Sequence, residues 1–365
     1  MRPSPLRVMR DIAQCRTPAL GGHLYVCPEC QHTEFAYPSC RNRHCPTCQG
    51  DRSQQWAEAQ KQRILPGGYF LLTFTVPEAL RRVARSHQRE VYDLLLRCAA
   101  QSIQKLAKDP RHLGAQPGMI GVLHTWTRDL HYHPHVHFLV TAGGLTPDGL
   151  AWRKPRNPNF LMPGRVLSVL FRAKLREALG KCGLDEAVPA KAWKQKWVVH
   201  VKDAGRGDTL LEYLSRYLFR PPISNRAIVR FGNGRVTFRY RDGRSNALRR
   251  ATVSTDEFIR RFLQHVLPRG FPRVRHDGCF SPGSAKKLAS ARARLERLEG
   301  TPPSRKTALT PIEQEGTEPI GEATEAAEKS SPLERPCPFC KTGAMRRVGE
   351  IGRVPRGGQP TRAPP

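Results

Sequence analysis

Short, mostly apolar runs predict several β-strands in the middle of the chain. Residues 69–76 form such a run, which ends at Pro77, and further candidates lie at 119–126 and 133–141, where histidines alternate with other residues. Side chains alternate between the two faces of a strand, so every second residue of these runs can face a core. Further strands are expected at 197–201 and 235–241.

Apolar residues at helical spacing predict helices between these strands. They are expected at about 78–106, 164–182 and 255–267, and a short polar helix is expected at 51–65. Strands interleaved with helices, with hairpin connections in the middle, are typical of an α+β domain with a mostly antiparallel sheet.

Histidines gather in the two central strands. His133, His135 and His137 alternate along one strand and therefore project from one face. A hairpin through residues 129–132 would bring His124 opposite them. Imidazoles at this spacing can bind a divalent metal ion. We therefore predict that His135 and His137 bind a catalytic metal ion, with His124 as the favoured third ligand and His133 as the reserve. The alternative is a polar strand face without metal.

Two tyrosines lie one helical turn apart later in the chain. Tyr213 and Tyr217 share the apolar face of an expected helix that ends near Pro221. Their Cβ atoms would be roughly 5–6 Å apart, so both phenols could address one metal site in turn. Such a pair taken alone usually belongs to a core. Beside the histidine strand, we interpret both tyrosines as catalytic nucleophiles.

The charge of the chain points to a polyanionic partner. The 61 lysines and arginines exceed the 31 acidic residues by 30, and arginine suits bidentate contacts with phosphate. A solubilising surface or an arginine-rich composition is the alternative. No apolar run reaches the length of a membrane span and no signal peptide is visible, so a cytoplasmic, nucleoid-associated protein without membrane contact is expected.

The spacing of the cysteines indicates metal binding in a reducing compartment rather than disulfides. The pairs Cys27-x2-Cys30 and Cys45-x2-Cys48 are separated by fourteen residues, which predicts one tetrahedral structural zinc site. So small a segment with few apolar residues would scarcely fold without metal.

Other residues interleave with these pairs and predict a second zinc site, or else packing and DNA contacts around one zinc. They are Cys15, His23, Cys40 and His44. Arg41 and Arg43 make the segment a candidate element for recognising DNA, with a solvated basic face as the alternative.

The carboxy-terminal part changes character after residue 281. Residues 301–335 are rich in Pro, Thr, Glu and Ala, and residues 281–336 are expected to form a disordered linker. The basic tail at 337–365 contains Cys337 and Cys340, which supply only half of a metal site. They could share zinc with another chain or have no role, and we assign them none.

These motifs together resemble the two-tyrosine HUH transposases of the rolling-circle type, the insertion-sequence 91 family. The matching parts are the stretch from Cys15 to Cys48, the block from His124 to His137, the segment from Tyr213 to Arg226, and residues 257–271. The resemblance spans about residues 10–280.

The resemblance implies a zinc-binding DNA-recognition domain at 10–60 and a HUH palm at 65–280, with helices on one side of the sheet. It implies attack by tyrosine on single-stranded element ends and target DNA, with Mg²⁺ or Mn²⁺ as the catalytic ion. The product would be a 5′-phosphotyrosine and a free 3′-OH. Asn225 and Arg226, inside the shared segment, are assigned to DNA binding.

Three other functions remain open at this point. The same chemistry serves replication initiators and conjugative relaxases. A decayed element could encode a zinc-dependent DNA-binding protein without catalysis. A histidine–metal hydrolase with water as nucleophile would leave the tyrosine pair without a role. Trp126 and Tyr132 could stack on bases or could equally be core residues.

Overall fold

The computed structural model describes residues 5–48, 64–206, 222–243, 245–299 and 335–353. The chain divides into two compact units, and each is described by itself. Unit 1 comprises residues 1–2 and 52–315, and unit 2 comprises residues 3–51 and 316–365. Antiparallel sheets and helices make up both, which confirms the α+β class.

A five-stranded antiparallel sheet forms the centre of unit 1. The strands lie in the order β12 (Val274–Gly278), β4 (Gly118–Trp126), β5 (Tyr132–Thr141), β3 (Gly68–Thr75) and β8 (Val199–Arg206). β3, β4 and β5 agree with the predicted strands because each is a run of mostly apolar residues that the sheet buries. β12 was not predicted, since Val-Arg-His-Asp-Gly carries little apolar signal and gains its conformation by pairing with β4.

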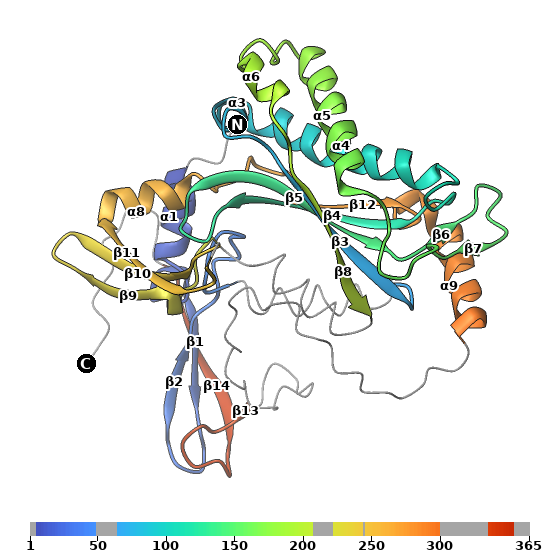
Figure 1. Ribbon diagram of the computed structural model, residues 1–365. Helices are drawn as coiled ribbons and strands as arrows, with labels where there is room; N and C mark the ends of the chain where they lie inside the picture. The colour runs from blue at the N-terminus through green and yellow to red at the C-terminus, as the bar shows by residue number, and fades with distance from the viewer. Residues whose placement is uncertain (1–4, 49–63, 207–221, 244, 300–334, 354–365) are drawn as a thin grey trace. The chain divides into compact units, whose positions relative to one another are not determined.

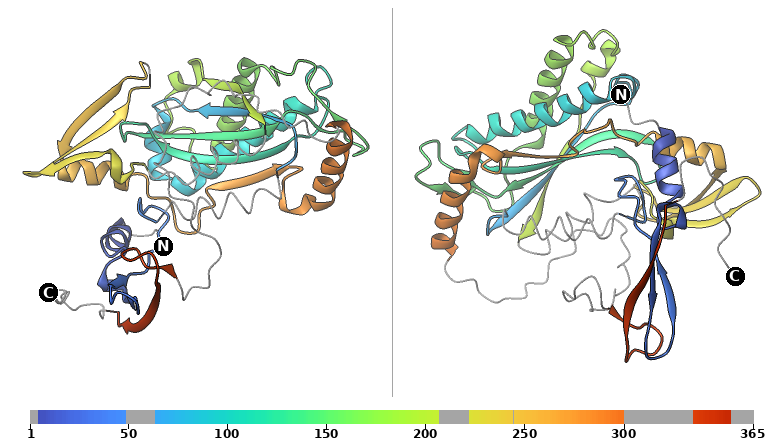
Figure 2. Two further views of the ribbon diagram at one scale, coloured as in Figure 1. Left: turned by 90° about the horizontal axis from the view of Figure 1, so that it is seen from below. Right: turned by 180° about the vertical axis from the view of Figure 1, so that it is seen from behind.

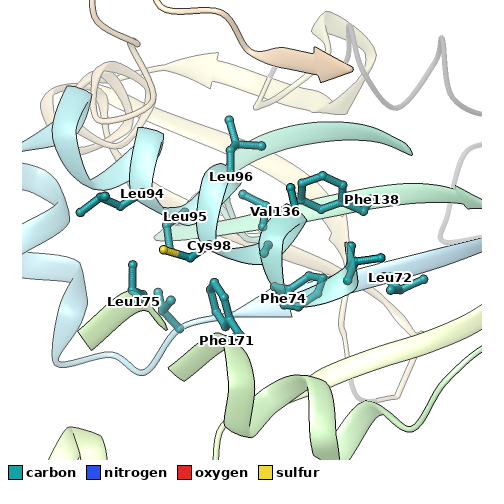
Figure 3. Packing of buried hydrophobic residues seen from close by; sticks show 14 of the residues in the cluster. Leu72, Phe74, Leu94, Leu95, Leu96, Cys98, Val136, Phe138, Phe171 and Leu175 are labelled. Atoms are coloured by element: carbon teal, nitrogen blue, oxygen red, sulfur yellow. The ribbon is translucent and has the colours of Figure 1, made fainter. Parts of the chain in front are cut away.

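Helices cover one face of this sheet (Figure 1). They are α3 (Leu80–Ser86), α4 (Gln88–Lys108), α5 (Gly164–Gly180) and α6 (Ala190–Lys194). The helix expected at 78–106 is divided at His87, which has φ −120° and ψ 56°. The core between the layers contains Phe74, whose ring lies 5.1 Å from Phe171 of α5 and 6.1 Å from Phe138 (Figure 3).

The opposite face of the sheet is covered at one end by α9 (Ala285–Glu299), as Figure 2 shows. Ala291 and Leu295 are buried there against Tyr69 and Ile120. The prediction of a disordered linker at 281–336 is therefore wrong for its first part, because α9 buries an apolar stripe. Residues 300–334 lie outside the described residues.

A smaller three-stranded sheet precedes β12. Its order is β11–β10–β9, from Leu248–Ser254, Arg235–Arg241 and Ile228–Gly232, and α8 (Thr255–Leu263) packs on it. β9 and β10 are joined by Asn233 and Gly234, whose positive φ angles of 51° and 68° fit a type I′ turn. The hydroxyl of Ser254 accepts a hydrogen bond from the amide of Glu257 at 3.2 Å, which starts α8.

Short elements complete unit 1. They are β6 (Gly144–Leu145), β7 (Trp152–Arg153), and the 3₁₀ turns η2 (Asn225–Ala227) and η3 (Pro282–Ser284). Among the described residues, none of the helices has the length and hydropathy that would let it cross a membrane. The polar helix expected at 51–65 falls almost entirely outside the described residues.

Unit 2 joins the two ends of the chain in one sheet. The strands lie in the order β13 (Arg335–Pro336), β14 (Ala344–Ile351), β1 (Gly22–Val26) and β2 (Thr33–Ala36). Helix α1 (Pro5–Ala13) and the 3₁₀ turn η1 (Pro18–Leu20) precede β1 in the chain. β14 pairs with β1 from Gly22 opposite Ile351 to Val26 opposite Arg346. The predicted separation of a 10–60 domain from a 337–365 tail is therefore wrong, because the tail supplies the neighbour of β1.

Candidate functional site

Three histidines converge on the face of the central sheet that is turned away from α4 and α5. His124 of β4 lies directly opposite His135 of β5, and His137 follows two residues later on the same face. One ring nitrogen of each lies within 4.8 Å of the others. The hairpin thus brings His124 to the pair as expected.

Hydrogen bonds orient two of these rings. The Nδ1 of His135 lies 2.7 Å from the carbonyl oxygen of His133, which can only accept, so Nδ1 carries the proton and Nε2 keeps its lone pair. The Nδ1 of His137 lies 2.9 Å from the hydroxyl oxygen of Thr73. Partners of this kind fix the ring orientation of histidine ligands in metal sites. Thr73 was not predicted, and only its register position opposite His137 could have indicated it.

Burial keeps two of the three imidazoles neutral. Burial lowers the pKa of His135 to about 4 and holds that of His137 well below its usual value. Neutral imidazoles offer lone pairs to a cation at pH 7, and a set of three suits a divalent ion of the first transition row. The donor set therefore fits a divalent metal ion.

His133 lies outside this group in the described part of the chain. A guanidinium nitrogen of Arg81 lies 3.2 Å from its Nδ1, which must accept that hydrogen bond. Burial, followed by the charge of Arg81 and the nearby His135, lowers the pKa of His133 to about 4. The geometry therefore favours His124 as the third ligand.

Aromatic residues flank the histidines. The ring of Trp126 stacks on that of His124 at 4.8 Å, and the guanidinium of Arg273 lies 5.0 Å from the centre of the Trp126 ring. Tyr132 is buried, with its hydroxyl 2.6 Å from that of Tyr92. Tyr132 is thus a core residue and does not offer a face for base stacking.

Stability should depend on pH through the buried histidines. Burial lowers the pKa of both His135 and His265 to about 4, against about 6.5 in an unfolded chain. Between these values the unfolded state binds more protons, so the free energy of unfolding falls as the pH falls below 6.5. The loss should be on the order of 1–2 kcal/mol for each histidine by pH 5. Denaturant titrations of metal-free protein at pH 7.5 and 5.0 measure it, and equal midpoints would contradict the expectation.

The cysteines form two groups that differ from the predicted site. Cys45 and Cys48 lie with Cys15 and Cys40, whereas Cys27 and Cys30 lie with Cys337 and Cys340, and the sulfurs of each group are within 4.8 Å of one another. The predicted set of Cys27, Cys30, Cys45 and Cys48 does not converge, because the β1–β14 pairing brings Cys337 and Cys340 to the first pair.

The two histidines considered for zinc lie in neither group of the described residues. The Nδ1 of His23 is 3.9 Å from a carboxylate oxygen of Glu350 across the β1–β14 pair. His44 is buried next to Cys45. Both groups are therefore all-cysteine sets, which are typical of structural zinc.

The four residues assigned to DNA binding differ in their exposure to solvent. Arg41, Asn225 and Arg226 are exposed to solvent, whereas Arg43 is partly buried and burial lowers its pKa. Tyr213 and Tyr217 lie outside the described residues, so the prediction that they are nucleophiles stays a prediction.

Two family models match the chain. The model "Putative transposase" matches residues 118–288, which include the histidine strands, and the model "Transposase zinc-binding domain" matches residues 1–76. The second match covers the whole of the first cysteine group but only half of the second.

Two curated relatives are similar over most of their length. A Sinorhizobium fredii protein called "Putative transposase y4qJ" is 43% identical over 292 residues, covering 74% of this chain and 73% of the relative. The transposase of insertion sequence element IS801 from Pseudomonas savastanoi is 30% identical over 294 residues, covering 76% and 70%. No solved structure matches the chain significantly.

Proposed function

Because the chain belongs to the insertion-sequence 91 family of transposases and has that family's zinc-binding domain, we propose that it nicks and rejoins single-stranded element ends through a covalent bond to tyrosine. The observation that carries the proposal is the convergence of His124, His135 and His137 in a strongly basic transposase. A DNA-binding protein without catalysis would have no use for three converging imidazoles, two of them held in orientation by hydrogen bonds.

The residues around the histidines hold the site ready for phosphate chemistry. The carbonyl of His133 and the hydroxyl of Thr73 fix two of the rings before DNA arrives. Mg²⁺ or Mn²⁺ held there would supply charge neutralisation at the scissile phosphate, which is most of what phosphoryl transfer requires.

Tyr213 and Tyr217 supply the nucleophiles in this proposal. The phenol oxygen of one bonds to phosphorus while the bond from phosphorus to the 3′ oxygen breaks. The phenol proton is released, and the 3′ oxygen takes up a proton to leave as a hydroxyl. One phosphodiester replaces another, so the reverse reaction can rejoin DNA without ATP. The second tyrosine would accept the second strand end.

Unit 2 serves recognition in this proposal. The match to a zinc-binding domain and the two all-cysteine groups support structural zinc. The exposed Arg41 and its neighbour Arg43 would contact DNA at the element ends. A protein with this task acts in the cytoplasm, at the nucleoid.

Covalent capture tests the proposal. The full-length protein is incubated with Mn²⁺ and a 3′-labelled single strand from an element end, and we expect a labelled adduct that resists SDS. Peptide mapping should place the DNA on Tyr213 or Tyr217, and EDTA should prevent the adduct. Nicked DNA without an adduct would show a water nucleophile, and bound but intact DNA would show a protein that only binds; either result would refute the proposal.

A further inference from the structure

The second cysteine group has the geometry of a filled zinc site. Cys27 and Cys340 have their sulfurs 3.7 Å apart, and so do Cys30 and Cys337. A tetrahedron with zinc–sulfur bonds of about 2.3 Å has edges of about 3.8 Å. Both Cys27 and Cys337 are buried, so four thiol groups are packed together in a small unit that has few apolar residues.

The two halves of this group have the same local structure. In each, a Cys-Pro-x-Cys turn is followed by a residue with left-handed φ, Gln31 at 60° and Lys341 at 62°. The amide of Gln31 donates to the carbonyl of Cys27 at 2.9 Å, and the amide of Lys341 donates to that of Cys337 at 3.0 Å. Two matched turns that face each other present their sulfurs to one centre.

The surroundings hold the halves together and leave no room for a side chain beside the sulfurs. A Cβ atom on Gly343 would lie 2.6 Å from the sulfur of Cys27, and the amide of Gly343 lies 3.4 Å from the sulfur of Cys340. The rings of His32 and Phe339 stack at 5.5 Å across the two turns. β1 and β14 run into the turns as paired strands.

We infer that Cys27, Cys30, Cys337 and Cys340 bind a second structural zinc ion, which clasps the two ends of the chain. This goes beyond the proposed catalytic function and does not depend on it. Zinc in this group makes the last described segment a part of the recognition unit. A zinc domain confined to residues 1–76 would instead hold only one ion.

Zinc content tests this inference. The wild-type chain, purified under reducing conditions and freed by mild chelation of any ion at the histidines, should contain two zinc ions, and the variant Cys337→Ser with Cys340→Ser, treated alike, should contain one. Cys182→Ser is the matched control, because Cys182 is exposed and outside both groups. A wild-type content of one, or an unchanged content in the double variant, overturns the inference.

A titration of metal-free wild-type protein with Co²⁺ guards against a variant that loses zinc only by unfolding. Absorption from tetrahedral cobalt–thiolate centres should rise until two equivalents are bound. Saturation at one equivalent overturns the inference. The inference is also overturned if a thiol titration of the wild-type protein finds that four cysteines are paired in disulfides.

A second feature, the sheet β9–β11, presents a basic face to solvent. Side chains alternate in β10, so Val236 and Phe238 are buried and Tyr240 packs beside Phe238 against α8, while the residues between them point to the other face. The open face in the two paired strands consists of Arg235, Thr237, Arg239 and Arg241 of β10, with Leu248, Arg250, Thr252 and Ser254 of β11. We call these eight positions the open β10–β11 face.

The open β10–β11 face concentrates positive charge. Arg239 lies directly opposite Arg250 in the register of the two strands, and Arg235 and Arg241 lie on the same face. β9, β10 and β11 contain no acidic residue. Arginines gathered on one face favour a polyanionic partner.

The chemistry of the open β10–β11 face fits duplex DNA. Arginine and threonine side chains contact phosphates, and a β-ribbon fits the major groove. Single strands are usually bound by aromatic platforms, and the eight positions hold no aromatic residue. We propose that the open β10–β11 face binds the backbone of duplex DNA next to the cleaved strand. This rests on the proposed function.

Salt-dependent binding tests the second proposal. The variant Arg239→Ser with Arg250→Ser should bind an element-end duplex at least about tenfold more weakly, with a salt slope smaller by about two. Arg249→Ser is the matched control, because Arg249 lies on the other face, 3.7 Å from Asp242. Equal losses in both variants, or none, would overturn the proposal. The adduct with a short single strand should persist in the double variant, and its absence in the wild type as well would instead refute the proposed function.

Discussion

Replacing His135 with alanine is expected to lower the rate of strand cleavage by roughly 10³-fold or more, with DNA binding nearly unchanged. His135 is one of the three histidines of the converging group, and the carbonyl of His133 holds its Nε2 available. Without it, only two imidazoles remain to hold the ion. Single-turnover cleavage with Mn²⁺ measures the rate, and fluorescence anisotropy measures binding.

Two other variants set the scale for this effect. Thr73→Val removes only the partner of His137 and should cost about 10–100-fold. His131→Ala, in the exposed turn of the same hairpin, should cleave at the wild-type rate. A parallel loss of binding and cleavage in His135→Ala would instead assign the histidines a role in folding.

Removing both phenol oxygens, with Tyr213→Phe and Tyr217→Phe together, is expected to abolish the covalent adduct. Phenylalanine keeps the ring that an apolar helix face would bury and removes only the nucleophile. Each single variant should retain part of the activity on one strand end, because the two tyrosines are proposed to act in turn. The SDS-resistant adduct is measured by gel. An adduct formed by the double variant would show that another residue is the nucleophile.

Local sequence patterns were sufficient for the parts of the fold that depend on local structure. β3, β4 and β5 follow from short apolar runs, and the position of His124 follows from a short hairpin. Residues far apart in sequence leave no such pattern. Cys337 and Cys340 have an ordinary spacing, and only the pairing of β14 with β1 shows which cysteines they join.

Supporting residues were the hardest to find from sequence. Thr73 is one of many threonines in strands, and it matters because the pairing of β3 with β5 places it opposite His137. Tyr132 was open to both interpretations until its contact with Tyr92 placed it in the core. Helix α9 was missed because its polar composition hid the buried Ala291 and Leu295.

The pairing of β1 with β14 sets an order of events during synthesis. Cys30 leaves the ribosome 307 residues before Cys337, which is roughly 15–60 s at bacterial rates of translation. Over that time β1 lacks the neighbour that β14 provides, while the catalytic unit has been made. A gene copy interrupted by a stop codon before β13 encodes a sheet with two of its four strands missing. Such a fragment should compete poorly for element ends, so broken copies would not inhibit an intact one.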